Sequence, residues 1–146
     1  VQQRFVDLGL PLILFNLFYS EQIDKSSGEA ILLFFANILH SDKEMQGNIM
    51  RGIEVIPMML VAKEMDFSSH TNTRCLSALL CIARSPDYRR MVVGQLDLLM
   101  ASVNANLSSP HRDEDFYSCA AVHCALLCEC SRISHDMHPP LAKSGV

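Results

Sequence analysis

The sequence predicts an all-α chain built from recurring groups of three helices. Apolar residues follow helical spacing over most of the 146 residues, as at Leu76, Leu79, Leu80 and Ala83. The same order of apolar helix, short capped helix, glycine and apolar helix occurs more than once. Glycines mark this order at positions 9, 52, 94 and 145. The first two steps between them fall in the range of about 40 to 47 residues that is typical of stacked helical repeats.

The segment from Ala78 to Val103 shows this order most clearly. After an apolar helix, Ser85-Pro86-Asp87 predicts a new helix start, because Ser caps, Pro suits the first turn and Asp suits the positive end of the helix dipole. We expect Gly94 to end that short helix by adopting the left-handed conformation. A third apolar run begins at Leu96.

Two Ser-x-x-Glu patterns predict helix starts earlier in the chain. In such a capping box each side chain binds a backbone N–H that the helix leaves without a partner. Ser26 with Glu29 predicts a helix that reaches His40. Because this helix is apolar on almost every side, we expect it to be central and packed on both sides. Ser41 with Glu44 predicts the short helix that ends at Gly52.

The other elements follow from apolar periodicity, prolines and polar breaks. Pro11 and Pro57 suit the first turn of a helix, where a missing N–H costs nothing. A polar insertion between Asn104 and Asp115 lengthens the last glycine step. The remaining predicted helices are 4–8, 10–19, 53–65 with a start near residue 55 or 56, 72–84, 95–104 and 113–131, whereas two prolines interrupt 134–145.

Three short motifs carry a family resemblance: FANIL at 35–39, ALLCI at 78–82 and ALLCE at 125–129. They are similar to the ALxNL-like core of the third helix in armadillo repeats, and the chain resembles that family over nearly its whole length. The resemblance implies a right-handed α-solenoid of about three three-helix repeats. It divides the chain 1–146 into a partial repeat 1–40, a repeat 41–84, a repeat with an insertion 85–131 and a truncated repeat 132–146. We expect a fragment of a longer solenoid, because neither end carries a polar capping face.

Charge and hydropathy exclude some classes of partner. The net charge is −4, which argues against nucleic acid, and the basic spot formed by Arg84, Arg89 and Arg90 is interrupted by Asp87. No apolar run reaches the length of about 18 residues that spans a bilayer, so we expect no membrane insertion. The expected partners are proteins, including an extended peptide, and neighbouring repeats of the same chain.

The six cysteines lie within apolar helical pattern, and four of them fall in one predicted helix. We expect reduced, buried thiols in a cytoplasmic protein that is not secreted, with the nucleus, cytoskeleton or cilium as alternative locations. Cys124 and Cys128 lie one helical turn apart, but no Cys-x2-Cys motif accompanies them. A structural role is therefore favoured over a metal site or a redox-sensing thiol.

No catalytic constellation is recognisable. The sequence lacks G-x-S-x-G, a phosphate-binding glycine loop and H-E-x-x-H. Five methionines at 45, 50, 58, 59 and 65 are interpreted as core residues, with an adaptable binding surface as the alternative. We predict a non-enzymatic scaffold or adaptor segment of a larger protein or assembly, without cofactor or metal. The alternative is a regulatory helical module of an enzyme whose catalytic domain lies outside this chain.

The resemblance also implies where a partner binds. In armadillo proteins the third helices line a groove that holds extended peptides, and the core asparagine bonds the peptide backbone. Asn37 is the residue here that matches that asparagine, and cysteine replaces it at 81 and 128. The repeat alignment predicts one exposed row with apolar neighbours that point into the core. Its members are Asn37, Arg74, Ser77, Cys81, Cys124 and Cys128.

Overall fold

The computed structural model describes residues 9–41, 43–61, 67–110 and 112–132, and this part of the chain is all-α. Its eight helices follow one another without a strand between them. They are α2 (Leu10–Phe18), α3 (Lys25–Ser41), α4 (Lys43–Gly52), α5 (Val55–Leu60), α6 (Ser69–Ala83), α7 (Pro86–Val93), α8 (Leu96–Leu107) and α9 (Glu114–Cys130).

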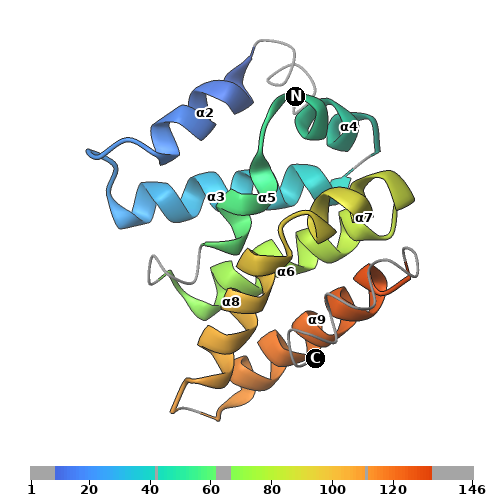
Figure 1. Ribbon diagram of the computed structural model, residues 1–146. Coiled ribbons are helices and arrows are strands. Elements are labelled where there is room, and N and C mark those ends of the chain that lie inside the picture. Colours follow the sequence, from blue (N-terminus) through green and yellow to red (C-terminus); the bar gives the residue numbers. More distant parts are fainter. Residues whose placement is uncertain (1–8, 42, 62–66, 111, 133–146) are drawn as a thin grey trace.

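Three long helices, α3, α6 and α9, lie side by side (Figure 1). They run in roughly the same direction, and α6 lies between the other two, with its most extensive contacts to them. Two shorter helices precede α6, and two precede α9. The helix ends at Ser41, Ala83 and Cys130 fall within one residue of the predicted repeat boundaries. The division into repeats itself stays a prediction.

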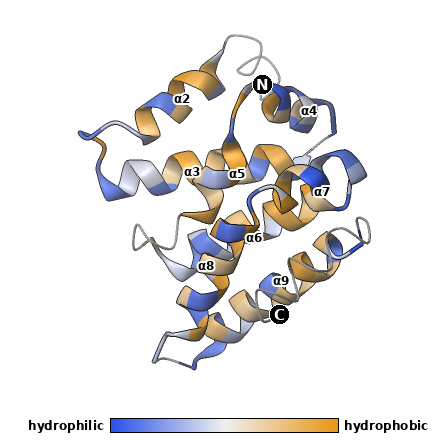
Figure 2. Ribbon diagram, viewed as in Figure 1, coloured by the Kyte–Doolittle hydropathy of each residue, from blue (hydrophilic) through white to orange (hydrophobic). Residues whose placement is uncertain are grey.

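The core follows the apolar faces of these helices. Figure 2 shows hydrophobic ribbon concentrated where α3, α5 and α6 meet. Leu32, Phe35 and Ile38 of α3 are fully buried, as expected for a helix that contacts α2, α4 and α6. The core-filler interpretation is confirmed for Met45, Met50, Met58 and Met59, all of which are buried. Met65 lies outside the described residues.

Both predicted capping boxes are wrong, because Ser26 lies inside α3 and Ser41 is the last residue of the same helix. Helix α3 begins one residue before Ser26, and the Ser27 N–H donates to Asp24 Oδ1 at 2.9 Å. Hydrogen bonding to Ser27, first by its side chain and then by its backbone N–H, lowers the pKa of the Asp24 carboxyl. Ser41 belongs to the end of α3, where its hydroxyl donates back to the Ile38 carbonyl at 2.9 Å. It therefore finishes one helix instead of starting the next.

Glu29 performs a capping function on a different helix from its own. The backbone N–H of Ser68, the N-cap residue of α6, donates to Glu29 Oε1 at 2.6 Å. The Ser68 hydroxyl accepts from the Thr71 N–H at 3.3 Å. The two halves of a capping box thus come from α3 and α6, so the cap also ties the start of α6 to its neighbour.

Arg89 of α7 closes the other end of α6. Its Nε donates to the Ala83 carbonyl at 2.9 Å, and its Nη2 donates to the Arg84 carbonyl at 3.3 Å. The same guanidinium pairs with Glu129 of α9 at 3.3 Å, and both side chains are largely buried. A cation at a helix C-terminus also favours the negative end of the dipole. One arginine therefore joins α6, α7 and α9.

The glycines at predicted helix boundaries act for different physical reasons. Gly94 has φ −61°, so the expected left-handed conformation is wrong there. A Cβ at this position would lie 3.3 Å from the Met91 carbonyl oxygen, and close packing is what favours glycine. Gly9 does take the left-handed conformation, with φ 76°, directly before α2. Gly52 is the last residue of α4, as expected.

The other boundaries shift by a few residues. Helix α6 begins at Ser69 instead of residue 72, and α8 reaches Leu107 instead of 104, so the polar connection to α9 is shorter than expected. Helix α5 begins at Val55, as predicted, and Asp113 caps α9 by accepting from the Phe116 N–H at 3.0 Å. The predicted helix 4–8, the end of 53–65 and the truncated repeat from 133 onward lie outside the described residues.

Ser68→Ala tests the shared cap. Removing the hydroxyl leaves the Thr71 N–H without its side-chain acceptor, and loss of such a cap typically costs about 1 kcal/mol. We expect the free energy of unfolding in urea to fall by about that amount. Ser69→Ala is the matched control, because the adjacent exposed serine makes no cap bond. Equal effects of the two substitutions would contradict the assignment of Ser68 as the cap.

Candidate functional site

The first part of the predicted row is formed by two adjacent helices, α3 and α6. Arg74 Nη2 donates to Asn37 Oδ1 at 2.7 Å, so these two predicted residues meet at the surface. Asn37 is exposed and Arg74 is half-buried. The Asn37 amide oxygen is thereby occupied, whereas its Nδ2 is a donor on an exposed side chain.

Ser77 and Cys81 continue the row along α6, and both are half-buried. Cys81 Sγ lies 3.8 Å from the Leu39 carbonyl oxygen, which accepts its weak S–H hydrogen bond. The apolar neighbours point inward as predicted, since Ile38, Leu39, Ile82 and Ala83 are all buried. On α3 and α6 the predicted row is therefore exposed or half-buried and the apolar residues that follow it are buried, whereas a binding role for the row stays a prediction.

The cysteines do not share one environment. Cys75, Cys119 and Cys130 are buried, whereas Cys124 and Cys128 are exposed on α9 and Cys81 is intermediate. The expectation that all six are buried is therefore wrong, because residues 124 and 128 fall on the side of α9 that faces away from α6 and α8. Burial raises the pKa of the Cys75 thiol to about 12 and that of the Cys130 thiol to about 11. None of the six cysteines takes part in a disulfide within the described residues.

A cavity of about 430 Å³ opens where α3 and α6 end and α4 and α7 begin. Cys81 lines it, so it adjoins the predicted row. Three basic side chains, His40, Lys43 and Arg84, also line it, and all three are exposed. The remaining lining residues are Leu39, Ser41, Gln46, Ser85 and Pro86. Sequence reasoning missed this site because its basic residues are far apart in the chain and join only when the helix ends meet.

The surroundings of this cavity change the pKa of His40. Its pKa is lowered from the ordinary value of 6.5, first by desolvation and then by the positive charges of Arg74 and Arg84. Both effects disfavour the protonated ring. His40 is thus biased toward the neutral imidazole in a place where cationic groups already gather.

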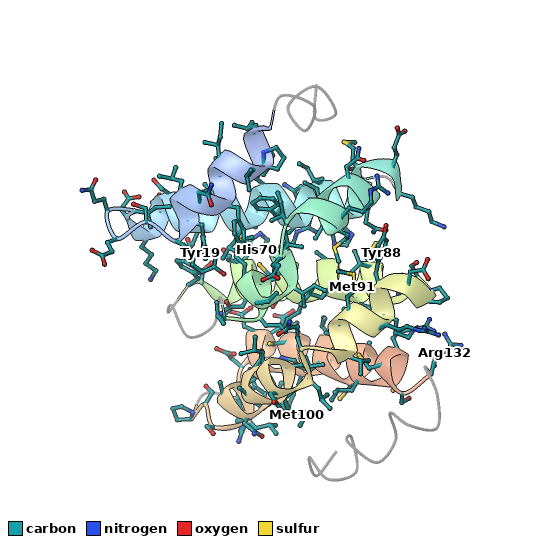
Figure 3. The ribbon with its side chains drawn as sticks, turned by 45° about the horizontal axis from the view of Figure 1, so that its top comes forward. Tyr19, His70, Tyr88, Met91, Met100 and Arg132 are labelled. Carbon is teal, nitrogen blue, oxygen red and sulfur yellow. The ribbon has the colours of Figure 1, made fainter. Side chains whose placement is uncertain are left out.

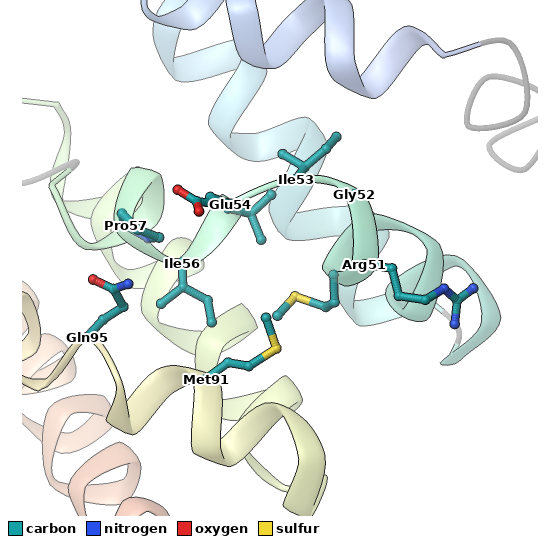
Figure 4. A pocket seen from close by; sticks show the side chains of 10 residues that line it. Arg51, Gly52, Ile53, Glu54, Ile56, Pro57, Met91 and Gln95 are labelled. Atoms are coloured by element: carbon teal, nitrogen blue, oxygen red, sulfur yellow. The ribbon is translucent and has the colours of Figure 1, made fainter.

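A second cavity, of about 510 Å³, lies between the α4–α5 and α7–α8 junctions (Figure 4). Its walls combine apolar residues, among them Met50, Ile56 and Met91, with the polar side chains of Glu54 and Gln95. Met91 is 43% exposed, and Figure 3 places it with Tyr88 on the side of α7 that faces α4. Arg51 points away from the opening in Figure 4 and donates to Asn48 Oδ1 at 2.6 Å. The cavity therefore offers both apolar contact and polar groups.

A nucleophile-like cluster is hidden between α8 and α9. His123 Nε2 lies 3.0 Å from Ser102 Oγ, and His123 Nδ1 lies 3.7 Å from Cys119 Sγ. All three residues are buried, and one imidazole tautomer satisfies both contacts. Nearby, Asn72 Oδ1 is buried without a hydrogen-bond partner among the described residues, beside a small cavity that Cys119 also lines. Burial of the whole cluster favours a structural role that fixes α8 on α9.

Within the described ranges, no group of three or more His, Cys, Asp or Glu side chains is placed to hold a metal ion. Every described helix also falls short of the length or apolarity required to cross a bilayer. Comparison with known proteins found no matching family model, curated protein or solved structure.

Arg84→Gln tests the electrostatics at His40. Removing this positive charge should raise the pKa of His40 toward 6.5 without reaching it, because desolvation, the larger cause, remains. The shift can be followed by an NMR titration of the ring protons, assigned with a His40→Gln variant. Arg90→Gln removes an equal charge from another exposed arginine that does not line the cavity and should leave the titration unchanged. A fall in the pKa after Arg84→Gln would contradict the assignment.

Thiol modification tests the division of the cysteines. With a disulfide reagent at about pH 8, we expect Cys124 and Cys128 to react first, because the reagent reaches exposed thiols directly. Cys75 and Cys130 should react only on unfolding, since burial raises their pKa values and keeps them protonated. The Cys124→Ser/Cys128→Ser variant should lose the fast phase, and Cys75→Ser should keep it. A fast phase that survives the double substitution would show that the exposed thiols are misassigned.

Proposed function

We propose that the chain is a scaffold or adaptor segment of an armadillo-like α-solenoid that docks a protein partner along the face formed by α3, α6 and α9. The observation that carries this proposal is the surface row that begins at Asn37 and Arg74. Its members are exposed or half-buried, whereas the residues that follow Asn37 and Cys81 in sequence are buried. Three adjacent helices thereby offer one extended surface, which suits a polypeptide better than a compact small molecule.

The Asn37–Arg74 pair supplies the polar recognition groups of this face. A hydrogen bond of 2.7 Å holds the two side chains together across α3 and α6. Because Arg74 occupies the Asn37 oxygen, the asparagine amide is oriented with its nitrogen available to a peptide carbonyl. Arginine is also among the residue types that most often dominate binding energy at protein interfaces. We therefore propose that this pair binds the main chain of the partner.

The proposed function is non-enzymatic. The burial of the Ser102–His123–Cys119 cluster supports this part of the proposal. Ser102, His123 and Cys119 form the arrangement most similar to a nucleophile with its base, and all three are at least nine-tenths buried. Their contacts join α8 and α9, and this structural role accounts for the cluster. The polar residues that we place at the docking face, Asn37 and Arg74, lie instead at the surface of the long helices α3 and α6.

Substitution of Asn37 and Arg74 tests the docking face. A partner is first captured from cell extract with the parent chain and identified, and its affinity is then measured with purified proteins. Asn37→Ala/Arg74→Ala should weaken binding at least about tenfold, the loss typical of an interface hot spot. Asn104→Ala/Arg90→Ala, which changes the same residue types at exposed positions of α8 and α7, should bind as the parent does.

Thermal melts must show that all variants remain folded. If the Asn37/Arg74 variant is folded and its affinity equals that of the parent, the α3–α6–α9 face is not the docking site and the proposal is wrong.

A further inference from the structure

The cavity at the ends of α3 and α6 has a charge that contrasts with the rest of the chain. The net charge of the chain is −4, yet His40, Lys43 and Arg84 line this cavity, and no carboxylate is among its described lining residues. The basic side chains come from the last turn of α3, the first residue of α4 and the residue after α6. Packing of helix ends thus creates a local cationic site on an acidic chain.

The cations of this cavity are not used to hold the fold together. Arg89, a few residues beyond the cavity, is bound to the Ala83 carbonyl and to Glu129. By contrast, the side chains of Lys43 and Arg84 make no hydrogen bond or ion pair with the described residues. Their exposed charges therefore remain available to a ligand.

The fixed charges around the cavity belong to its lysine and arginine side chains. Desolvation first, and then the positive charges of Arg74 and Arg84, lower the pKa of His40, so both arginines act on this ring. An anion in the cavity would be attracted by Lys43 and Arg84. Ser85, which also lines the cavity, is the N-cap residue of α7, and its hydroxyl makes no cap hydrogen bond. It is therefore a neutral donor beside the cations.

The position of the cavity decides which kind of anion fits. Cys81 belongs both to the cavity wall and to the row on α6, so the cavity is continuous with the face that contains Arg74 and Asn37. A volume of about 430 Å³ accommodates a side chain with part of its backbone. An anionic group on a polypeptide that already lies along the face would enter it directly.

We propose that this cavity binds an acidic side chain, Asp or Glu, of a protein segment that lies along the α3–α6–α9 face. The inference rests on the proposed function and deepens it, because it assigns the partner an acidic segment. The Asn37–Arg74 pair positions the main chain, and the cationic cavity selects the charge. Binding should weaken as salt is raised from about 50 mM to about 500 mM, because exposed charges are screened.

The test uses two fluorescein-labelled peptides, GSEEEEGS and GSQQQQGS in one-letter code, and fluorescence anisotropy with the 146-residue chain. We expect the glutamate peptide to bind and the glutamine peptide to bind at least about tenfold more weakly. Lys43→Gln/Arg84→Gln should weaken binding of the glutamate peptide about tenfold. Lys25→Gln/Arg90→Gln removes the same net charge from exposed residues outside the cavity and should have an effect of less than about twofold.

Two outcomes would overturn the inference: no preference for glutamate, or equal losses in the cavity variant and its charge-matched control. The second would mean that the chain's overall charge, and not this cavity, governs binding. Neither outcome bears on the Asn37/Arg74 experiment with the captured partner, so the acidic site can fail while the docking face stands. Thermal melts of both charge variants should match the parent, since no described bond depends on these side chains.

Discussion

Helix α6 depends on its neighbours at both ends. Its first turn is capped jointly by Ser68 and by Glu29 of α3, and its last carbonyls are bound by Arg89 of α7, which also reaches Glu129 of α9. The ends of the central helix are thus closed by side chains of α3 and α7, and Arg89 also ties α7 to α9. These contacts link the three long helices, whose exposed sides form the face proposed for docking.

The same closure of helix ends creates the cationic cavity. Once α3 and α6 stop at Ser41 and Ala83, the next helices begin within a few residues, and their first side chains meet the last side chains of the long helices. Arg89 binds the Ala83 carbonyl at the end of α6, whereas Arg84 is exposed beside His40 and Lys43. Neighbouring arginines in one short basic segment thus have separate roles, one in stability and one in charge recognition.

Local sequence signals predicted the positions of the helices well but predicted their capping residues poorly. Apolar periodicity, together with serine, proline and glycine signals at the boundaries, placed α2, α4, α7 and α9 within about two residues, because burial of one face determines where a helix lies. The Ser-x-x-Glu patterns failed because serine and glutamate are satisfied by whichever partner is nearest in space. Glu29 accepts a hydrogen bond from the Ser68 N–H, thirty-nine residues away, and the Ser41 hydroxyl donates to the Ile38 carbonyl of its own helix. No residue near 26–29 in the sequence indicates that Glu29 binds the Ser68 N–H.

The sequence by itself determined that the chain is helical, where most helices lie, and that residues after Asn37 and Cys81 point into the core, because periodic apolar burial leaves little choice. Tertiary structure decided which polar side chains meet. The Asn37–Arg74 bond, the joint cap of α6, the buried Ser102–His123–Cys119 contacts and the cationic cavity each join residues from different helices. Such contacts depend on the rotation and stacking of whole helices, which hydrophobic periodicity constrains only to a face and not to a partner.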